Sequence, residues 1–412
     1  MNQDIFLDNA ATTRTDPEVL EAMTPWLGEN YGSPATLYAF GAQAKQAIEQ
    51  ARQHLADLIG AEAKDLYFTS GATESNNWAI KGVCDALEGK GKHIITEQAE
   101  HHSILLPCKY MEKKGWEVTY LPVDGDGLVD PADVKAAVRE DTVLISIVHG
   151  NHEIGTIQPI SEIGAIAREA GVAFHVNAAQ TVGHVPVDVE NLACDLLSIS
   201  GHKFYGPKGV GALYARRGVR ISPLLHGGGQ EKKRRAGTHN VPGIVGLGKA
   251  AELARKNLKT ESQRMTGLRD YIMEKIEANL DDIRLNGHRT KRLPNNVNYS
   301  IEGIEGESIM LSLSYPTAEN ARAIFVSTGS ACVSGTLEPS HILLSLGIPA
   351  ELAHGSVRIS LSRENNREDA DYALNALFEV TERLRSMSPV YKRGAKQCST
   401  ANSEDCDCEA SC

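Results

Sequence analysis

The sequence lacks any long hydrophobic run. Its longest mainly apolar segment, Val143 to Val148, is far shorter than the roughly 20 residues that a membrane-spanning helix needs, and Met1 to Phe6 lacks a signal-peptide pattern. An excess of positive charge is also missing. The 42 basic and 53 acidic residues give a net charge of −11, which offers no electrostatic reason to expect nucleic acid or an anionic membrane as a partner. The sequence therefore predicts a cytoplasmic protein.

Two common phosphate-binding motifs are absent. No GxxxxGK followed by Ser or Thr occurs, which excludes a Walker loop, and no GxGxxG occurs, which argues against a dinucleotide-binding protein. The cysteines predict no disulfide framework either, because half of the eight crowd into the end of the chain. Those four are Cys398, Cys406, Cys408 and Cys412, and the other four are Cys84, Cys108, Cys194 and Cys332.

What is present is the pattern of an α/β protein. Gly41 to Ile59 carries apolar residues at three- and four-residue steps, as an amphipathic helix does. Short apolar segments then alternate with helix-like stretches, which favours a mainly parallel sheet that binds ligands beyond the carboxyl ends of its strands. The predicted strands are Leu66 to Thr69, His93 to Thr96, Val118 to Leu121, Val143 to Val148, Val172 to Val176 and Leu196 to Ser200.

A chain of 412 residues is longer than one hydrophobic core usually supports, so we expect a large α/β domain and a smaller α+β domain. The large domain should span residues 17–257 and the small domain residues 258–392, with residues 1–16 joining the small one. Residues 393–412 are polar and rich in cysteine, and we expect them to form a mobile tail because they cannot bury apolar surface.

The segment Ser70 to Glu74 follows a predicted strand and opens a helix. Small residues at a helix start leave backbone N–H groups open to an anion, and the helix dipole favours negative charge there, so a phosphate could bind. The alternative is an ordinary helix that is capped by Thr73.

Lys203 also follows a predicted strand, among glycines that permit close approach of the backbone. A lysine in such a place can lose part of its hydration, which lowers its pKa toward that of a Schiff-base nucleophile. An exposed surface lysine is the alternative, which the apolar neighbours Phe204 and Tyr205 disfavour.

Several histidines follow predicted strands. His101 could stack on an aromatic cofactor and exchange protons, or it could cap a helix. His149, His152 and Glu153 match neither HExxH nor HxxEH, so no zinc site is expected.

Cys332 differs from the other cysteines of the main body, because almost every neighbour from Val326 to Gly335 is small or polar. Such a loop gives a thiol the exposure and freedom that a nucleophile needs to reach a substrate and carry a product away. Ligation of an iron–sulfur cluster by Cys332 is kept as a secondary interpretation.

The chain contains, in order, the segments FTSGATESNN, AEH, EIGTIQP, SGHKFYGPKG, HGGGQE, RRAGTHN, STGSAC and LEPSH. Together they resemble the NifS/IscS-type cysteine desulfurases of the class V aminotransferase superfamily, which are fold type I pyridoxal-phosphate enzymes with an aspartate aminotransferase-like fold. The resemblance runs from about Ile5 to Lys392.

The resemblance implies a homodimer that binds pyridoxal 5'-phosphate, with Lys203 in a Schiff base and His101 stacked on the ring. Arg358 would bind the carboxylate of L-cysteine, and the Cys332 thiolate would attack the substrate's sulfur. Alanine would leave, and the persulfide would pass to a sulfur acceptor such as an iron–sulfur scaffold. The implied cofactor site comprises Ala72, Thr73, His101, His152, Asn177, Gln180, Ser200, His202 and Lys203, with Thr238 reaching the phosphate from the partner subunit.

Four positions depart from the family pattern. Asn177 stands where an aspartate should pair with the pyridine nitrogen, and an amide cannot supply that negative charge, so we expect a weaker electron sink. His152 replaces an asparagine near the cofactor's oxygen. Ser33 replaces an asparagine of the substrate site, and Tyr38 replaces a histidine.

These departures leave alternatives to a desulfurase open. One is an aminotransferase or β-lyase that does not use Cys332, and another is a catalytically weakened scaffold in a sulfur-transfer complex. The tail cysteines Cys406, Cys408 and Cys412 could relay persulfide or bind a soft metal, although their spacing fits no well-defined site.

Overall fold

A seven-stranded sheet forms the centre of the larger part of the molecule, in the order β2-β8-β7-β6-β5-β3-β4. The computed structural model describes residues 4–315, 321–328 and 338–391. Four neighbouring pairs of strands run parallel, namely β3 with β4, β3 with β5, β5 with β6, and β6 with β7. The predicted mainly parallel sheet is therefore confirmed. Its parallel strands are β3 (His93–Glu97), β4 (Glu117–Leu121), β5 (Thr142–Val148), β6 (Ala173–Asn177) and β7 (Leu196–Ser200).

One strand of this sheet was not predicted. β8 (Gly211–Ala215) lies between β7 and β2 (Leu66–Thr69) and runs antiparallel to both. Its five residues are all buried, but two of them are alanine and one is glycine, which strands use rarely. The local sequence therefore carries little signal for this strand.

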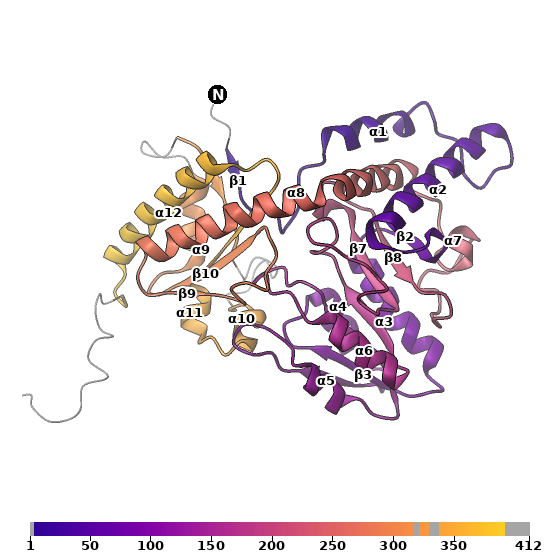
Figure 1. The fold of residues 1–412 in the computed structure, drawn as a ribbon, viewed down its shortest axis with the longest axis horizontal. Helices are drawn as coiled ribbons and strands as arrows, with labels where there is room; N and C mark the ends of the chain where they lie inside the picture. The colour runs from indigo at the N-terminus through magenta and orange to yellow at the C-terminus, as the bar shows by residue number, and fades with distance from the viewer. Residues whose placement is uncertain (1–3, 316–320, 329–337, 392–412) are drawn as a thin grey trace, which may run out of the picture.

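Helices cover both faces of the sheet (Figure 1). The predicted helix at Gly41 to Ile59 is confirmed as α2 (Ala39–Ile59), which buries its apolar stripe in the larger core and ends at Gly60 in a left-handed conformation. The others here are α1 (Pro17–Leu27), α3 (Ala72–Leu87), α4 (His102–Glu112), α5 (Pro131–Ala137), α6 (Ile160–Ala170) and α7 (Gln230–Lys233), with 3-10 turns η1 (Ala63–Asp65) and η2 (Gly201–Lys203).

A second, smaller hydrophobic core is built on a three-stranded antiparallel sheet, β12-β10-β9. Its strands are β9 (Ile283–Leu285), β10 (Asn296–Ile301) and β12 (Ser356–Ser360). The N-terminal strand β1 (Ile5–Phe6) pairs with β11 (Ile324–Phe325) and packs into this core. The helices of this part are α9 (Gly306–Ser314), α10 (His341–Ser345), α11 (Ala350–His354) and α12 (Arg367–Met387).

One long helix, α8 (Val241–Asn279), reaches from the larger part to the smaller one (Figure 1). Its first half places Leu247 and Ala251 in the larger core, and its second half places Ile272 and Ile276 in the smaller one. The predicted boundary between residues 257 and 258 falls inside this helix, and the domain boundaries stay a prediction. None of the helices in the described ranges has both the length and the apolar character to cross a membrane.

Candidate active site

A cavity of about 620 Å³ opens at the carboxyl ends of β2, β5, β6 and β7. β12 of the smaller part contributes to its wall, so the cavity lies between the two cores. This size lies within the usual range for sites that hold small ligands or cofactors. The structure brings together in its lining most of the predicted site residues, namely Ala72, Thr73, His101, His152, Asn177, Gln180, Ser200, His202, Lys203 and Arg358.

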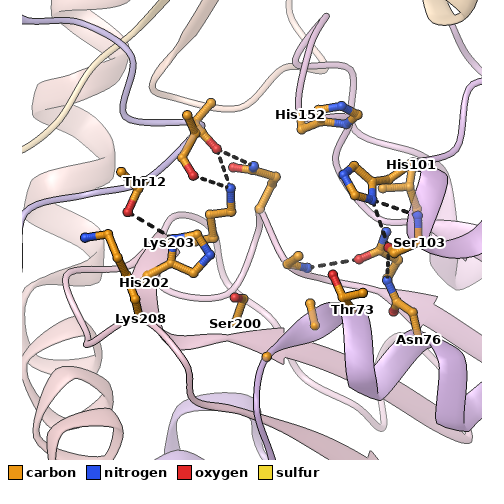
Figure 2. A pocket seen from close by; sticks show the side chains of 18 of the residues that line it. Thr12, Thr73, Asn76, His101, Ser103, His152, Ser200, His202, Lys203 and Lys208 are labelled. Carbon is orange, nitrogen blue, oxygen red and sulfur yellow. Dashed lines mark hydrogen bonds between the residues drawn. The ribbon is translucent and has the colours of Figure 1, made fainter. Parts of the chain in front are cut away.

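The amino end of α3 forms one end of the cavity. Gly71 is the N-cap of this helix, and within the described chain no side chain caps it, so the alternative of a cap by Thr73 is wrong. Gly71 has φ 147°, and a Cβ atom there would lie 3.8 Å from the Ser200 Oγ. Figure 2 shows Thr73 and Ser200 together at this end. The open N–H groups of the helix and the missing side chain leave a cradle for an anion.

Lys203 lies directly beyond β7, in the turn η2. Its Nζ donates hydrogen bonds to the carbonyl oxygens of Ala10 at 2.6 Å and Ala11 at 2.8 Å. The side chain lines the cavity, so the surface alternative is wrong. The larger part thus supplies the amine, and the segment that follows β1 supplies its acceptors.

His101 both caps a helix and faces the cavity. It is the N-cap of α4, where its Nδ1 accepts a hydrogen bond from the Ser103 N–H at 3.0 Å, and its ring also lines the cavity. Burial, and after it the charge of Lys203, lowers the pKa of His101 to about 4. The ring is therefore neutral near pH 7, and because Nδ1 accepts, Nε2 carries the proton.

His152 lies beside His101, with ring centroids 5.0 Å apart and an interplanar angle of 77° (Figure 2). Burial lowers the pKa of His152 well below its ordinary value, and the neighbouring His101 and Arg358 lower it further. An uncharged imidazole thus occupies the position where the family pattern has a neutral amide.

Asn177 ends β6 and lines the cavity. Its Nδ2 donates to the Glu100 Oε2 at 3.1 Å, and its Oδ1 accepts from the Ala179 N–H at 3.4 Å. Gln180 lies one turn further along the chain, and its Nε2 donates to the Ala10 carbonyl oxygen at 2.9 Å. Glu100 does not line the cavity and was missed by the sequence reasoning.

Arg358 approaches the cavity from β12 in the smaller part. One of its terminal nitrogens lies 2.7 Å from the Asp8 carboxylate, and the other donates to the His152 carbonyl oxygen at 3.0 Å. Its Nε is buried and has no hydrogen-bond partner among the described residues. A carboxylate that entered the cavity could satisfy this donor. Asp8 was not predicted, because only the fold brings it to an arginine 350 positions away.

Two predicted site residues lie away from this lining. Thr238 is exposed in the loop before α8, and Ser33 is half-buried in the loop before α2, and neither belongs to the described residues that line the cavity. Cys332 lies outside the described residues, as do the tail cysteines. In the described ranges no three His, Cys, Asp or Glu side chains are placed to hold a metal ion.

The lining fits pyridoxal 5'-phosphate. The cradle at Gly71 would hold the phosphate, together with the side chains of Thr73, Ser200 and His202. Lys203 would meet the aldehyde carbon, and the neutral ring of His101 would stack on the cofactor ring. The cationic side chains at the cavity match an anionic cofactor and an amino acid carboxylate.

The chain is similar to known proteins over nearly its whole length. Residues 5–373 match the model of the aminotransferase class-V family. A cysteine desulfurase IscS from Dictyoglomus turgidum is 54% identical over 393 residues, covering 95% of this chain and 98% of the relative. Another IscS, from Methanosarcina thermophila, is 54% identical over 389 residues, covering 94% of this chain and 95% of the relative.

Solved structures agree. One described as a NIFS-like protein superposes with a TM-score of 0.86 at 38% identity, covering 93% of this chain and 100% of its own. A structure described as SspA in complex with cysteine gives a TM-score of 0.76 at 38% identity, covering 87% of this chain and 98% of its own. The chain therefore belongs to the class-V aminotransferases, in the NifS/IscS-type cysteine desulfurase family with the pyridoxal-phosphate fold type I.

Proposed function

We propose that this protein is a pyridoxal-phosphate-dependent cysteine desulfurase, which converts L-cysteine to L-alanine and transfers sulfur to Cys332 as a persulfide. The observation that carries the proposal is the meeting of Lys203, His101 and Arg358 in one cavity with an uncapped helix end. Lys203 supplies an amine, His101 supplies an uncharged ring, and Arg358 supplies a cation for the substrate carboxylate.

Each side chain has a defined task in this reaction. Bound pyridoxal phosphate supplies a carbonyl for amine exchange and an electron-withdrawing ring. Lys203 would hold the cofactor through its amine and would move a proton at the substrate's α-carbon. Arg358 would bind the substrate carboxylate and so fix how the substrate lies in the cavity. His101 carries its proton on Nε2 and stays neutral, so it can stack without adding charge.

The sulfur transfer balances without an external oxidant. The substrate's carbon–sulfur bond breaks and a sulfur–sulfur bond forms on Cys332. The carbon that loses sulfur gains a proton and becomes the methyl group of alanine. One thiol substrate and one enzyme thiol thus give one alanine and one persulfide, which an acceptor such as an iron–sulfur scaffold would then take.

A homodimer belongs to the same proposal. Thr238 is exposed and lies away from the cavity of its own chain, which is the place expected of a residue that reaches the phosphate of a partner subunit. We also propose the cytoplasm as the compartment, since Cys84, Cys108 and Cys194 are free cysteines and Cys332 must stay a reduced thiol in order to attack the substrate's sulfur.

Incubation of the reconstituted protein with cysteine tests the function. Alanine, pyruvate and Cys332-bound sulfur are quantified in the same sample. Alanine in step with bound sulfur supports the desulfurase, whereas pyruvate with ammonia indicates a β-lyase and a keto acid indicates an aminotransferase. Cys332→Ser should keep the yellow colour of the bound cofactor and abolish the persulfide, and Cys194→Ser is the matched control, because Cys194 is buried.

A protein that binds no cofactor and forms no alanine would be the catalytically weakened scaffold that the departures at Asn177 and His152 also allow. Asn177→Asp combined with His152→Asn would then be expected to restore activity. Both side chains line the cavity, where the cofactor would bind.

A further inference from the structure

The hydrogen bond between Asn177 and Glu100 bears on how the cofactor ring is held. An aspartate at position 177 would meet the ring nitrogen with a negative charge, and Asn177 cannot. A carboxyl group lies in contact with the Asn177 amide, whose Nδ2 donates to the Glu100 Oε2 at 3.1 Å. Both side chains are buried, Glu100 completely, so water does not screen this contact.

Glu100 is the member of a buried carboxyl pair whose oxygen accepts hydrogen bonds. Its Oε2 also accepts the His101 N–H at 2.7 Å, so two donors favour its charged form. Glu97 lies close by on β3, is equally buried, and has a pKa raised well above its ordinary value by burial and by the charge of Glu100. Burial raises the pKa of Glu100 to about 8. A cation in the cavity would lower this pKa again and so favour the ionised form of Glu100.

The same contacts determine the orientation of the Asn177 amide. If the amide were turned over, its oxygen would face a carboxylate oxygen, and its NH2 group would face the Ala179 N–H. Both contacts would then bring like groups together. Only the observed orientation satisfies both, and it makes the oxygen the acceptor that Asn177 offers to a group in the cavity.

We propose that Glu100 is a positioning residue for the cofactor ring. It holds Asn177 by the NH2 group, so that the amide oxygen accepts a hydrogen bond from the protonated ring nitrogen. Its carboxylate also supplies, through the intervening Asn177 side chain, the negative charge that an asparagine lacks. This inference rests on the proposed function, since it needs pyridoxal phosphate in the cavity.

The protonation of the ring nitrogen can be measured directly. The holoprotein is reconstituted with pyridoxal phosphate that carries 15N in the ring, and its 15N NMR spectrum is recorded at one fixed pH. The wild type should show a protonated nitrogen. Glu100→Gln keeps the size of the side chain and removes its charge, and it should lower the ratio of protonated to neutral nitrogen by at least ~tenfold.

The control is Glu97→Gln, a buried carboxyl of the same pair with no hydrogen bond to Asn177, which should leave the nitrogen signal unchanged. Asn177→Asp should give a protonated nitrogen. Glu100→Gln in that background should change the signal much less than in the wild type, because the carboxylate introduced at position 177 then supplies the charge itself. A purely structural role for Glu100 would show no such dependence on residue 177.

An unprotonated nitrogen in the wild type, or equal signals in the wild type and Glu100→Gln, would overturn the inference while cofactor binding and alanine formation persist. Failure of the wild type to bind the cofactor would overturn the proposed function and this inference together. Melting temperatures establish that each variant folds. If Glu100→Gln does not fold, Glu100→Asp replaces it and should shift the signal partway, because it keeps the charge but withdraws it from Asn177.

Discussion

The Lys203 Nζ lies 2.6 Å from the carbonyl oxygen of Ala10, which also accepts a hydrogen bond from Gln180. The lysine that we assign to the cofactor is thus held by the chain segment that follows β1. The Ala11 carbonyl oxygen accepts a second hydrogen bond from the same amine at 2.8 Å. Binding of the cofactor must release the amine from these acceptors.

Lys203→Ala is expected to lose the cofactor colour that survives dialysis and to lower alanine formation by on the order of 10³-fold or more, because the covalent anchor and the proton carrier are removed together. Borohydride reduction of the wild type, followed by peptide mapping, should place the cofactor mass on Lys203. Lys208 lines the same cavity and is the internal control. Cofactor mass on Lys208 would show that the assignment is wrong.

Arg358→Lys should raise the KM for cysteine by about 10- to 100-fold and change kcat much less. An ammonium group cannot keep Asp8 and the His152 carbonyl while it also binds a carboxylate with a fork of two donors. Steady-state kinetics over a range of cysteine concentrations check this. Arg363→Lys is the matched control, since Arg363 also pairs with an aspartate, Asp16, but does not line the cavity. Equal KM values for the two variants would contradict the role of Arg358.

Arg52→Ala should destabilise the protein by about 3–5 kcal/mol, because it leaves the buried carboxylate of Glu231 without its main partner. Both side chains are almost fully buried, and the Arg52 Nη1 lies 2.7 Å from Glu231. Urea unfolding gives the cost, and Arg139→Ala, which removes an exposed ion pair with Asp141, should cost less than about 1 kcal/mol. A similar cost for both variants would contradict this prediction.

The buried ion pair of Arg52 and Glu231 also predicts how the stability of the protein changes in acid. Burial alone would raise the pKa of Glu231, but the hydrogen bonds from Arg52 and His239 lower it to about 2. A lowered pKa means that this contribution to stability is present above the ordinary pKa of glutamate and is lost as the pH falls toward 2. Glu231→Gln should remove that part of the acid sensitivity.

The buried carboxyl of Glu153 predicts that the stability of the protein falls as the pH rises. Burial raises the pKa of this carboxyl to about 7, although the Ser340 hydroxyl donates to it. The folded protein therefore holds a proton that the unfolded chain loses near pH 4.5, and stability falls by about 3 kcal/mol as the pH rises from there to about 7. Melting temperatures across this range should show a shallower slope for Glu153→Gln than for the wild type. An unchanged slope would mean that Glu153 is ionised in the folded state.

The sequence predicted those features that depend on local pattern. The strand at Leu196 to Ser200 was visible as an apolar run, and Lys203, which the sequence suggested could be partly desolvated beyond its end, lines a cavity. β8 was missed because the small residues of Gly211 to Ala215 give no strong strand signal, and its place in the sheet comes from pairing with two distant strands.

The hydrogen-bond partners of the site residues could not be predicted from the sequence, for the same reason. Asp8 and Arg358 meet only because β1 and β12 belong to the same small core. The Glu100 contact to Asn177 joins the chain after β3 to the end of β6. Such pairs are set by the order of strands in a sheet, which hydrophobic periodicity does not record. The only sequence signal for Glu100 was an acidic residue shortly after a predicted strand, and the sequence assigned it no role.

The width of the cavity depends on the shape of helix α8, which reaches from one part of the molecule to the other. Its 39 residues form a rod about 58 Å long, and none of residues 255–264, between its two packed halves, is buried. In that stretch the helix is not packed into either core, and direct contacts such as the hydrogen bond from Arg358 to the His152 carbonyl oxygen also join the two parts. Lys203 belongs to the larger part and Arg358 to the smaller part, so bending of α8 would change the distance between the two side chains that the substrate must contact.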